Sequence, residues 1–181
     1  MPFFSYLAAE STIGDLLQRD NDRMIDLSRF TEAVLHGPSP LAPGQRELIA
    51  AYVSGVNECE FCHRAHKAFA ESHGMDISAF NKLMNDIESA AIDESLKPIL
   101  RFVRKLTETP SKMTQADADA VFAAGWNEQA LQDAILVTSL FNFYNRYVDG
   151  HGINPAPMDV CRQVGSIIKE KGYMFQHEQS A

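Results

Sequence analysis

Two of the three cysteines of this chain lie close together, as Cys59-x-x-Cys62, and a histidine follows four residues later at His66. Residues three or four positions apart share one face of a helix, so the two thiols can meet and His66 can reach Cys62. Two thiols one turn apart close a disulfide with little backbone movement, which suits reversible oxidation and reduction. The spacing therefore predicts a dithiol centre with a proton acceptor beside it.

The residues around the pair predict two consecutive helices. Asn57 is a favoured N-cap residue, and it forms a capping-box pattern with Glu60. Cys59 would then be the second residue of the new helix and Cys62 the fifth. Because unpaired N–H groups and the helix dipole stabilise a thiolate near a helix start, this placement favours Cys59 as the more acidic thiol. Before the pair, apolar residues recur at helical intervals, at Leu48, Ile49, Tyr52, Val53 and Val56.

An acidic residue precedes the pair at a fixed distance. The resulting set resembles the active-site motif of the AhpD-like alkylhydroperoxidases, within the carboxymuconolactone decarboxylase superfamily, and consists of Glu47, Cys59, Cys62 and His66. The lead-in to this motif and the C-terminal helices extend the resemblance from about residue 16 onward. It implies an AhpD-like helical bundle with duplicated helical hairpins.

Three further positions refine the resemblance. Asn57 and the pair Asn145-Arg146 resemble the branch of the superfamily described as peroxidase-related. The chain departs from the family pattern at Phe61, where the best-studied members carry a histidine directly before the second cysteine. His63 follows that cysteine instead, so the resemblance implies a proton relay that differs in detail.

The resemblance implies a catalytic cycle. Cys62 attacks a hydroperoxide as a thiolate and becomes a sulfenic acid, while its proton passes to His66 and onward to Glu47. Cys59 then forms a disulfide with Cys62, and an external dithiol or a protein reductant reduces it. This role for Cys62 conflicts with the helix-start argument for Cys59, and the reach of His66 favours Cys62. The function predicted is that of a thiol-dependent hydroperoxide reductase.

Three alternatives stay open. The pair could reduce the disulfide of a partner peroxiredoxin through a mixed disulfide at Cys59, or the chain could be a non-redox, decarboxylase-like member of the superfamily. It could also be a zinc-stabilised assembly module whose ligands include Cys59, Cys62 and His66, although no fourth ligand lies at zinc-finger spacing. The resemblance itself implies no bound metal or cofactor, and a homo-oligomer, commonly a trimer or hexamer.

Composition narrows the class of protein. The 181 residues suffice for one domain, 1–181, of which residues 1–10 are a candidate N-terminal arm. A net charge of −8 without any basic block argues against nucleic acid or an anionic membrane as partner. No apolar run approaches a membrane span, and the first residues lack the basic region of a signal peptide. Three cysteines do not make a disulfide framework, so we predict a cytoplasmic protein.

Helical periodicity runs through the chain, and no stretch shows the alternation of a strand, so the predicted fold class is all-α. The starting signals are Pro43, Asp76, Asp93, Thr114 with Asp117, and Asn127, and the last helix should end near Lys171. Short connections favour antiparallel packing. A shift of 85 positions brings Asn57 onto Asn142, which is compatible with a worn internal repeat.

The remaining reactive or aromatic residues are given structural roles. We expect Cys161 to be a buried structural thiol and His63 to lie at the surface or at a pocket rim. Asn145-Arg146 could serve to tie helix ends together. The aromatic cluster in the same region should lie in the core or at a subunit interface, and comprises Phe141, Phe143, Tyr144 and Tyr147.

Overall fold

A computed structural model describes residues 1–178, and this part of the chain contains helices and no strand, as the periodicity predicts. The helices are α1 (Ile13–Arg19), α2 (Asn21–His36), α3 (Pro43–Val56), α4 (Glu60–Ser72), α5 (Phe80–Asn85), α6 (Leu96–Glu108), α7 (Gln115–Ala123), α8 (Glu128–His151), α9 (Met158–Lys171) and α10 (Phe175–Glu178), with 3-10 turns η1 (Ile77–Ala79) and η2 (Pro110–Lys112). None of the helices in this part combines the length and the hydropathy that a membrane crossing requires.

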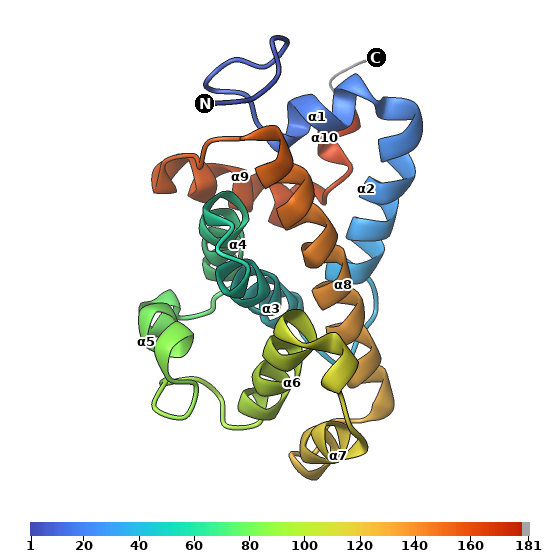
Figure 1. Ribbon diagram of the computed structural model, residues 1–181, viewed down its shortest axis with the longest axis vertical. Helices are drawn as coiled ribbons and strands as arrows, with labels where there is room; N and C mark the ends of the chain where they lie inside the picture. The colour runs from blue at the N-terminus through green and yellow to red at the C-terminus, as the bar shows by residue number, and fades with distance from the viewer. Residues whose placement is uncertain (179–181) are drawn as a thin grey trace.

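The hairpin of α3 and α4 lies at the centre of the fold (Figure 1). Helix α3 is buried along almost its whole length, because α4, α6 and α8 pack around it. Helix α9 packs on the other side of α4, while α6 and α7 lie at the far end of the molecule from α1 and α10 (Figure 1). The residues of the predicted motif therefore lie on this central hairpin.

Most of the predicted starting signals are used. Pro43 is the first residue of α3, and Asn127 caps α8 by accepting a hydrogen bond from the backbone of Ala130. Asp76 accepts from the backbone N–H of Ser78, and the Thr114–Asp117 capping box opens α7. The side chains of Asn127, Asp76 and Asp117 each satisfy a backbone donor that the helix itself leaves unpaired.

Two helix boundaries differ from the prediction. The helix expected to begin at Asp93 begins at Leu96, because Asp93 accepts hydrogen bonds from the backbone and hydroxyl of Ser95 in a turn before the helix. The short helix α10, and the segment between Gly172 and α10, were not predicted. Gly172 has a positive φ of 74°, which only glycine adopts readily, and it turns the chain so that Tyr173 enters the core.

The junction between α3 and α4 corrects the predicted position of the cysteines. Asn57 closes α3 and does not cap α4, and Glu58 takes a left-handed conformation with φ 59°. The N–H groups of Glu58 and Cys59 bond to the carbonyls of Gly55 and Ser54, as in a Schellman motif. Cys59 is consequently the N-cap residue of α4, and Cys62 is its third residue.

The left-handed Glu58 offers a test of this junction. A non-glycine residue in this conformation destabilises the folded state by about 1–2 kcal/mol. Glycine avoids this cost, but its larger freedom in the unfolded chain lowers the free energy of unfolding by about 0.5–1 kcal/mol. We expect Glu58→Gly to raise the free energy of unfolding by up to about 1 kcal/mol in urea titration. Glu60→Gly is the control: Glu60 takes the ordinary helical conformation at the start of α4 and pairs with Arg64, so its replacement should destabilise the protein. Equal signs for the two variants would contradict the conformation described.

Residues 1–10, predicted as a possible arm, lie against the end of α8 of the same chain. The N–H of Phe3 donates to the carbonyl of His151, and the Asn154 amide donates to the carbonyl of Ala9. The ring of Phe4 packs on His151, while the side chain of Phe3 is 72% exposed. The segment is thus fixed at its backbone and presents aromatic side chains to solvent.

Candidate active site

The two cysteines of the motif are unpaired thiols at the start of α4 and differ in access. Cys59 is fully buried, whereas Cys62 borders a cavity of about 320 Å³ and is 3% exposed. His66 borders the same cavity, one turn along α4. The structure thus brings Cys62 and His66 to a common space, as their spacing predicts. The direct hydrogen bond that this spacing allows is not formed among the described residues.

The walls of the cavity are mainly apolar and come from α1, α2, α4, α8, α9 and α10 and from the segments on either side of α9. The apolar lining includes Ile13, Leu17, Phe61, Ala65, Phe69, Phe141, Val160, Val164, Ile168 and Phe175. Two of its polar groups satisfy one another, because the hydroxyls of Thr31 and Tyr144 are hydrogen-bonded at 2.7 Å. A molecule that enters this cavity meets mainly apolar surface, with Cys62 and His66 in one wall and polar side chains of α1 and α2, among them Asp15 and Ser28, in another.

Behind the cavity, His66 is held by a buried carboxylate. Its Nδ1 lies 2.7 Å from Oε2 of Glu47, which is fully buried on α3. The hydroxyl of Tyr173 donates to the other carboxylate oxygen, Oε1, at 2.6 Å. Burial raises the pKa of Glu47, but the positive charge and hydrogen bond of His66, the nearby imidazole of His36 and the hydrogen bond from Tyr173 outweigh it and lower the pKa to about 2. Glu47 is therefore an anion that fixes the orientation of the imidazole.

Aromatic rings fix the other sides of the imidazole of His66. Phe69 and Phe141 meet it edge-on, with ring centroids at 4.8 and 4.4 Å. Because Nδ1 faces Glu47, it carries the proton of the neutral ring, and Nε2 keeps a lone pair that can accept a proton. The carboxylate and the two aromatic rings thus fix the orientation of the imidazole.

The thiol of Cys62 is difficult to ionise. Its pKa is raised well above the ordinary value, first by its hydrogen bond with Cys59, then by burial and by the negative charge that Cys59 can carry. A hydrogen bond from Asn145 on α8 acts in the opposite direction and lowers the pKa. To react as a thiolate at neutral pH, Cys62 therefore needs a group that removes its proton or that stabilises its negative charge.

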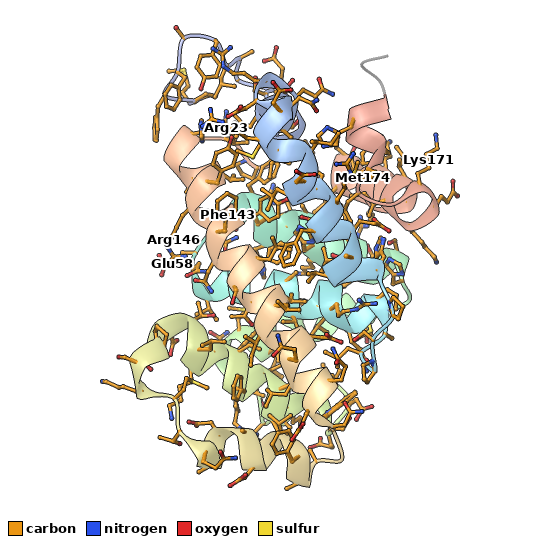
Figure 2. All side chains as sticks on the ribbon, turned by 90° about the vertical axis from the view of Figure 1, so that its right-hand side faces the viewer. Arg23, Glu58, Phe143, Arg146, Lys171 and Met174 are labelled. Atoms are coloured by element: carbon orange, nitrogen blue, oxygen red, sulfur yellow. The ribbon has the colours of Figure 1, made fainter. Side chains whose placement is uncertain are left out.

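Asn145 belongs to a hydrogen-bond network between α3 and α8. Its amide donates to the hydroxyl of Ser54 at 2.9 Å, and its oxygen accepts from the amide of Asn57 at 2.9 Å. Asn57 also donates to Asn142, the residue that the proposed repeat aligns with it. Arg146 in turn donates to Asn142, and Figure 2 shows it at the same edge of the molecule as Glu58. The signature Asn145-Arg146 thus ties α8 to the α3–α4 junction.

This arrangement predicts how the reactivity of Cys62 depends on pH. Because its pKa is raised, the thiolate fraction should still be growing above pH 8.5, the ordinary thiol pKa being about 8.5. The rate of Cys62 alkylation by iodoacetamide, followed by peptide mass, should rise with pH through this range. Asn145→Ala should move the whole profile to higher pH, because it removes the hydrogen bond that favours the thiolate.

Arg146→Ala provides the matched control for that profile. Arg146 is exposed and bonds to Asn142, so its loss should leave the alkylation profile of Cys62 in place. A profile that levels off below pH 8, or one that Arg146→Ala displaces as far as Asn145→Ala does, would contradict the environment described.

Other sequence candidates lie outside the dithiol centre. His63 is half-buried, and its Nδ1 bonds to the carbonyl of Ala51, so it is neither at the surface nor on the cavity rim. His151 bonds to the carbonyl of Tyr147 within α8. Cys161 is buried, as expected, and its pKa is raised by burial. It also borders the cavity that Cys62 borders, a position that the sequence did not indicate.

Metal-ligating side chains converge at a place that the sequence did not suggest. Among the described residues, the donor atoms that come together belong to His36, Glu47 and His73, and not to Cys59, Cys62 and His66. Burial lowers the pKa of His36, but the carboxylates of Glu47 and Glu32 outweigh it and raise the pKa above its ordinary value. The pKa of His73 is lowered, chiefly by burial. The zinc ligands considered from the sequence, Cys59, Cys62 and His66, therefore do not form such a cluster among the described residues.

Sequence reasoning missed two contributors to the site. Tyr173 follows the last long helix and carries no motif, and His36 ends α2 as one of the basic residues common at helix ends. Tyr173 reaches Glu47 from 126 positions further along the chain, and His36 reaches it from the end of the preceding helix. Asn145 was identified only through the family resemblance, because its distance in sequence from the cysteines does not indicate a contact with them.

Residues 24–105 match the model of the carboxymuconolactone decarboxylase family, and this region contains the four residues of the motif. No curated protein sequence matches the chain.

Two solved structures share the fold. An uncharacterized peroxidase-related protein from Silicibacter sp. TM1040 is 24% identical, with a TM-score of 0.74 over 80% of this chain and 75% of the other. A protein from Ralstonia eutropha JMP134, described as an alkylhydroperoxidase AhpD core and an uncharacterized peroxidase-related protein, is 22% identical, with a TM-score of 0.75 over 83% of this chain and 78% of the other. Residues 24–105, less than half of the chain, are thus similar to the carboxymuconolactone decarboxylase family, and the chain shares the AhpD-like fold of these two structures.

Proposed function

We propose that the protein is a thiol-dependent reductase of organic hydroperoxides. The observation that carries this proposal is the position of Cys62: it borders an apolar cavity, with Cys59 directly behind it and the pair His66–Glu47 beside it. A nucleophile, a resolving thiol and a positioned base are the groups that a two-electron thiol oxidation needs. The peroxidase-related descriptions of the two similar structures agree with it.

The reaction proceeds in two steps. His66 takes the proton of Cys62, and the thiolate attacks the outer oxygen of the hydroperoxide; the O–O bond breaks, Cys62 becomes a sulfenic acid, and the alkoxide leaves as an alcohol with the proton from His66. Cys59 then attacks the sulfenic sulfur, which forms the disulfide and releases water. An external dithiol or protein reductant returns both thiols to the reduced state.

Access selects Cys62 as the sulfur that is oxidised first. Cys62 borders the cavity, whereas Cys59 is fully buried and does not line it. Cys59 is the N-cap residue of α4 and not its second residue, as the sequence predicted. A lowered pKa at a helix start would therefore not make Cys59 reactive toward substrate, because Cys59 does not border the cavity. The burial of Cys59 likewise disfavours a mixed disulfide between Cys59 and a partner peroxiredoxin, whereas a reductant can reach the disulfide at Cys62 through the cavity.

The shape of the cavity favours a substrate with an apolar group. About 320 Å³ lined by aromatic and aliphatic side chains exceeds the needs of hydrogen peroxide and fits a small alkyl or aryl hydroperoxide. Phe61 lines this wall at the position where the best-studied relatives carry a histidine. The base at this site is therefore His66, with no second imidazole from that position.

Intact-mass measurement after one equivalent of cumene hydroperoxide tests the proposal. We expect a loss of two hydrogens, located by proteolysis to the peptide that carries Cys59 and Cys62, with Cys161 unchanged. Addition of dithiothreitol should restore the original mass. An unchanged mass after this treatment, or a disulfide that includes Cys161, would overturn the assignment.

Two further properties stay predictions. The family resemblance implies a homo-oligomer, a trimer or hexamer, and the sequence predicts a cytoplasmic location.

A further inference from the structure

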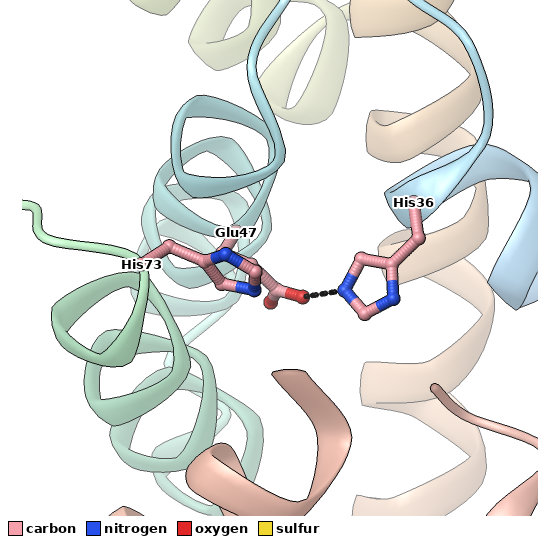
Figure 3. Close-up of side chains that lie close together, drawn as sticks. All are labelled: His36, Glu47 and His73. Carbon is pink, nitrogen blue, oxygen red and sulfur yellow. Dashed lines mark ion pairs between the residues drawn. The ribbon is translucent and has the colours of Figure 1, made fainter. Parts of the chain in front are cut away.

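A second cluster of reactive side chains lies on the far side of Glu47 from His66. His36 ends α2, Glu47 lies on α3, and His73 follows α4, so three elements bring these side chains together. One donor atom from each lies within 4.8 Å of the other two. Figure 3 shows the ring of His36 facing the carboxylate from one side, with His73 beside the same carboxylate.

The two imidazoles have nitrogens without hydrogen-bond partners. Nε2 of His36 and Nε2 of His73 are both buried, and neither makes a hydrogen bond within the described residues. Nε2 of His36 lies 3.7 Å from Oε1 of Glu47, which is too long for a hydrogen bond. Buried polar atoms are nearly always partnered, and unpaired ones commonly mark the place of an ion or a water molecule.

The carboxylate of Glu47 has room for one more partner. Its two oxygens offer about four lone pairs. Oε2 accepts from His66, and Oε1 accepts from Tyr173, so Oε1 keeps a lone pair on the side of His36. An acceptor that is fully buried and anionic at this point attracts a cation.

We propose that His36, Glu47 and His73 form a binding site for a divalent transition-metal ion of the zinc class. Two imidazoles and one carboxylate are a common ligand set for zinc, with a fourth position left for water or another ligand. Nitrogen donors disfavour magnesium and calcium, which select oxygen ligands. Ligand atoms about 2.0–2.1 Å from a tetrahedral ion lie about 3.3 Å apart, so small rotations of the side chains close the site.

An outer carboxylate supports this assignment. Glu32 Oε1 lies 3.4 Å from Nδ1 of His36 and faces the ring nitrogen opposite to the proposed metal ligand. A carboxylate behind a histidine is the usual arrangement in zinc sites, because it orients the ring and raises the basicity of the ligating nitrogen. The other oxygen of Glu32 accepts from the backbone N–H of Tyr173, which fixes the carboxylate in place.

The metal and the dithiol would share Glu47, through one oxygen each. The ion would bind Oε1, and His66 is hydrogen-bonded to Oε2, so that one buried carboxylate connects the two sites. This inference departs from the family resemblance, which implies no metal. It does not depend on peroxide chemistry, and it is tested without it.

Cobalt(II) absorbance measures the site directly. The full chain should be examined as the wild type and with Cys59→Ser, Cys62→Ser and Cys161→Ser combined, so that thiolates cannot supply ligands. We expect one cobalt ion per chain in both proteins, displaced by zinc and not by magnesium. His36→Gln and His73→Gln should each weaken cobalt binding by about tenfold or more, since loss of an outer-shell partner alone costs about 10–100-fold. His151→Gln, on α8 and in contact with Phe4, is the control and should bind as the wild type does.

Two results would overturn the site: cobalt binding that disappears when the thiols are removed, or equal binding by the wild type and His36→Gln. Circular dichroism establishes whether each variant is folded. Should His73→Gln fail to fold, Glu32→Gln replaces it, because Glu32 is partly exposed and acts through His36; a loss of about 10–100-fold is then expected. Unchanged affinity in Glu32→Gln together with His36→Gln would refute the proposal.

Discussion

Cys62→Ser is expected to lower the rate of organic hydroperoxide consumption by about a thousandfold or more, because the hydroxyl that replaces the thiol is neither a thiolate nor oxidisable to a sulfenic acid. The measurement is the loss of cumene hydroperoxide in the presence of excess dithiothreitol, corrected for the reaction without protein. Since the serine occupies less volume than the cysteine and Cys62 borders a cavity, the fold should tolerate the change. Robust turnover by this variant would refute the role given to Cys62.

Cys59→Ser separates the two sulfurs. It removes the resolving thiol and leaves Cys62 able to attack, so one equivalent of hydroperoxide should be consumed and a sulfenic acid should accumulate, which dimedone traps. Cys161→Ser should still form the disulfide between Cys59 and Cys62, as shown by the loss of two hydrogens. Were Cys59→Ser unable to consume a single equivalent while Cys62→Ser did so, the order of the two cysteines would be reversed.

The second large effect is expected for Glu47→Gln, which keeps the shape of the side chain and removes its charge. A neutral amide no longer stabilises the positive imidazole that forms when His66 takes a proton. Positioned acid–base groups contribute about 10²–10⁴-fold, and we expect a loss of turnover within this range. Assays that contain a chelator keep any metal at the neighbouring cluster from affecting the comparison.

Tyr173→Phe is the matched control for Glu47→Gln. It removes the hydrogen bond to Oε1 and leaves the charge of Glu47 and its bond to His66. A hydrogen bond to a charged group contributes about 1.5–3 kcal/mol, so Tyr173→Phe should lower the free energy of unfolding by about that amount while turnover falls much less than in Glu47→Gln. Full turnover by Glu47→Gln would show that His66 works without its carboxylate.

The local part of the fold could be predicted because its signals act between neighbours in sequence. Pro43, Asp76, Thr114 and Asn127 mark helix starts in the structure, since each acts on the first turn that follows it. Asn57 was misinterpreted because the same residue type suits the end of one helix and the start of the next. In the structure Asn57 ends α3, and its amide donates hydrogen bonds to Asn142 and Asn145 of α8.

The dithiol motif was visible in the sequence because helical spacing places its residues on one short segment. Cys59, Cys62 and His66 lie within eight positions, and the family resemblance added Glu47. Spacing alone could not decide which thiol faces open space. That depends on the walls of the cavity, which α1, α8 and α9 supply.

By itself, the sequence determined the helical fold class, the dithiol at the start of a helix and the histidine one turn beyond it, because these follow from interactions within a few residues. Only the tertiary structure decided that Tyr173 and His36 meet Glu47 and that Cys62 alone of the pair borders the cavity. The physical reason is that burial, and with it the direction of a pKa shift, depends on side chains from helices far apart in the chain. Packing, which no local pattern records, brings those helices together.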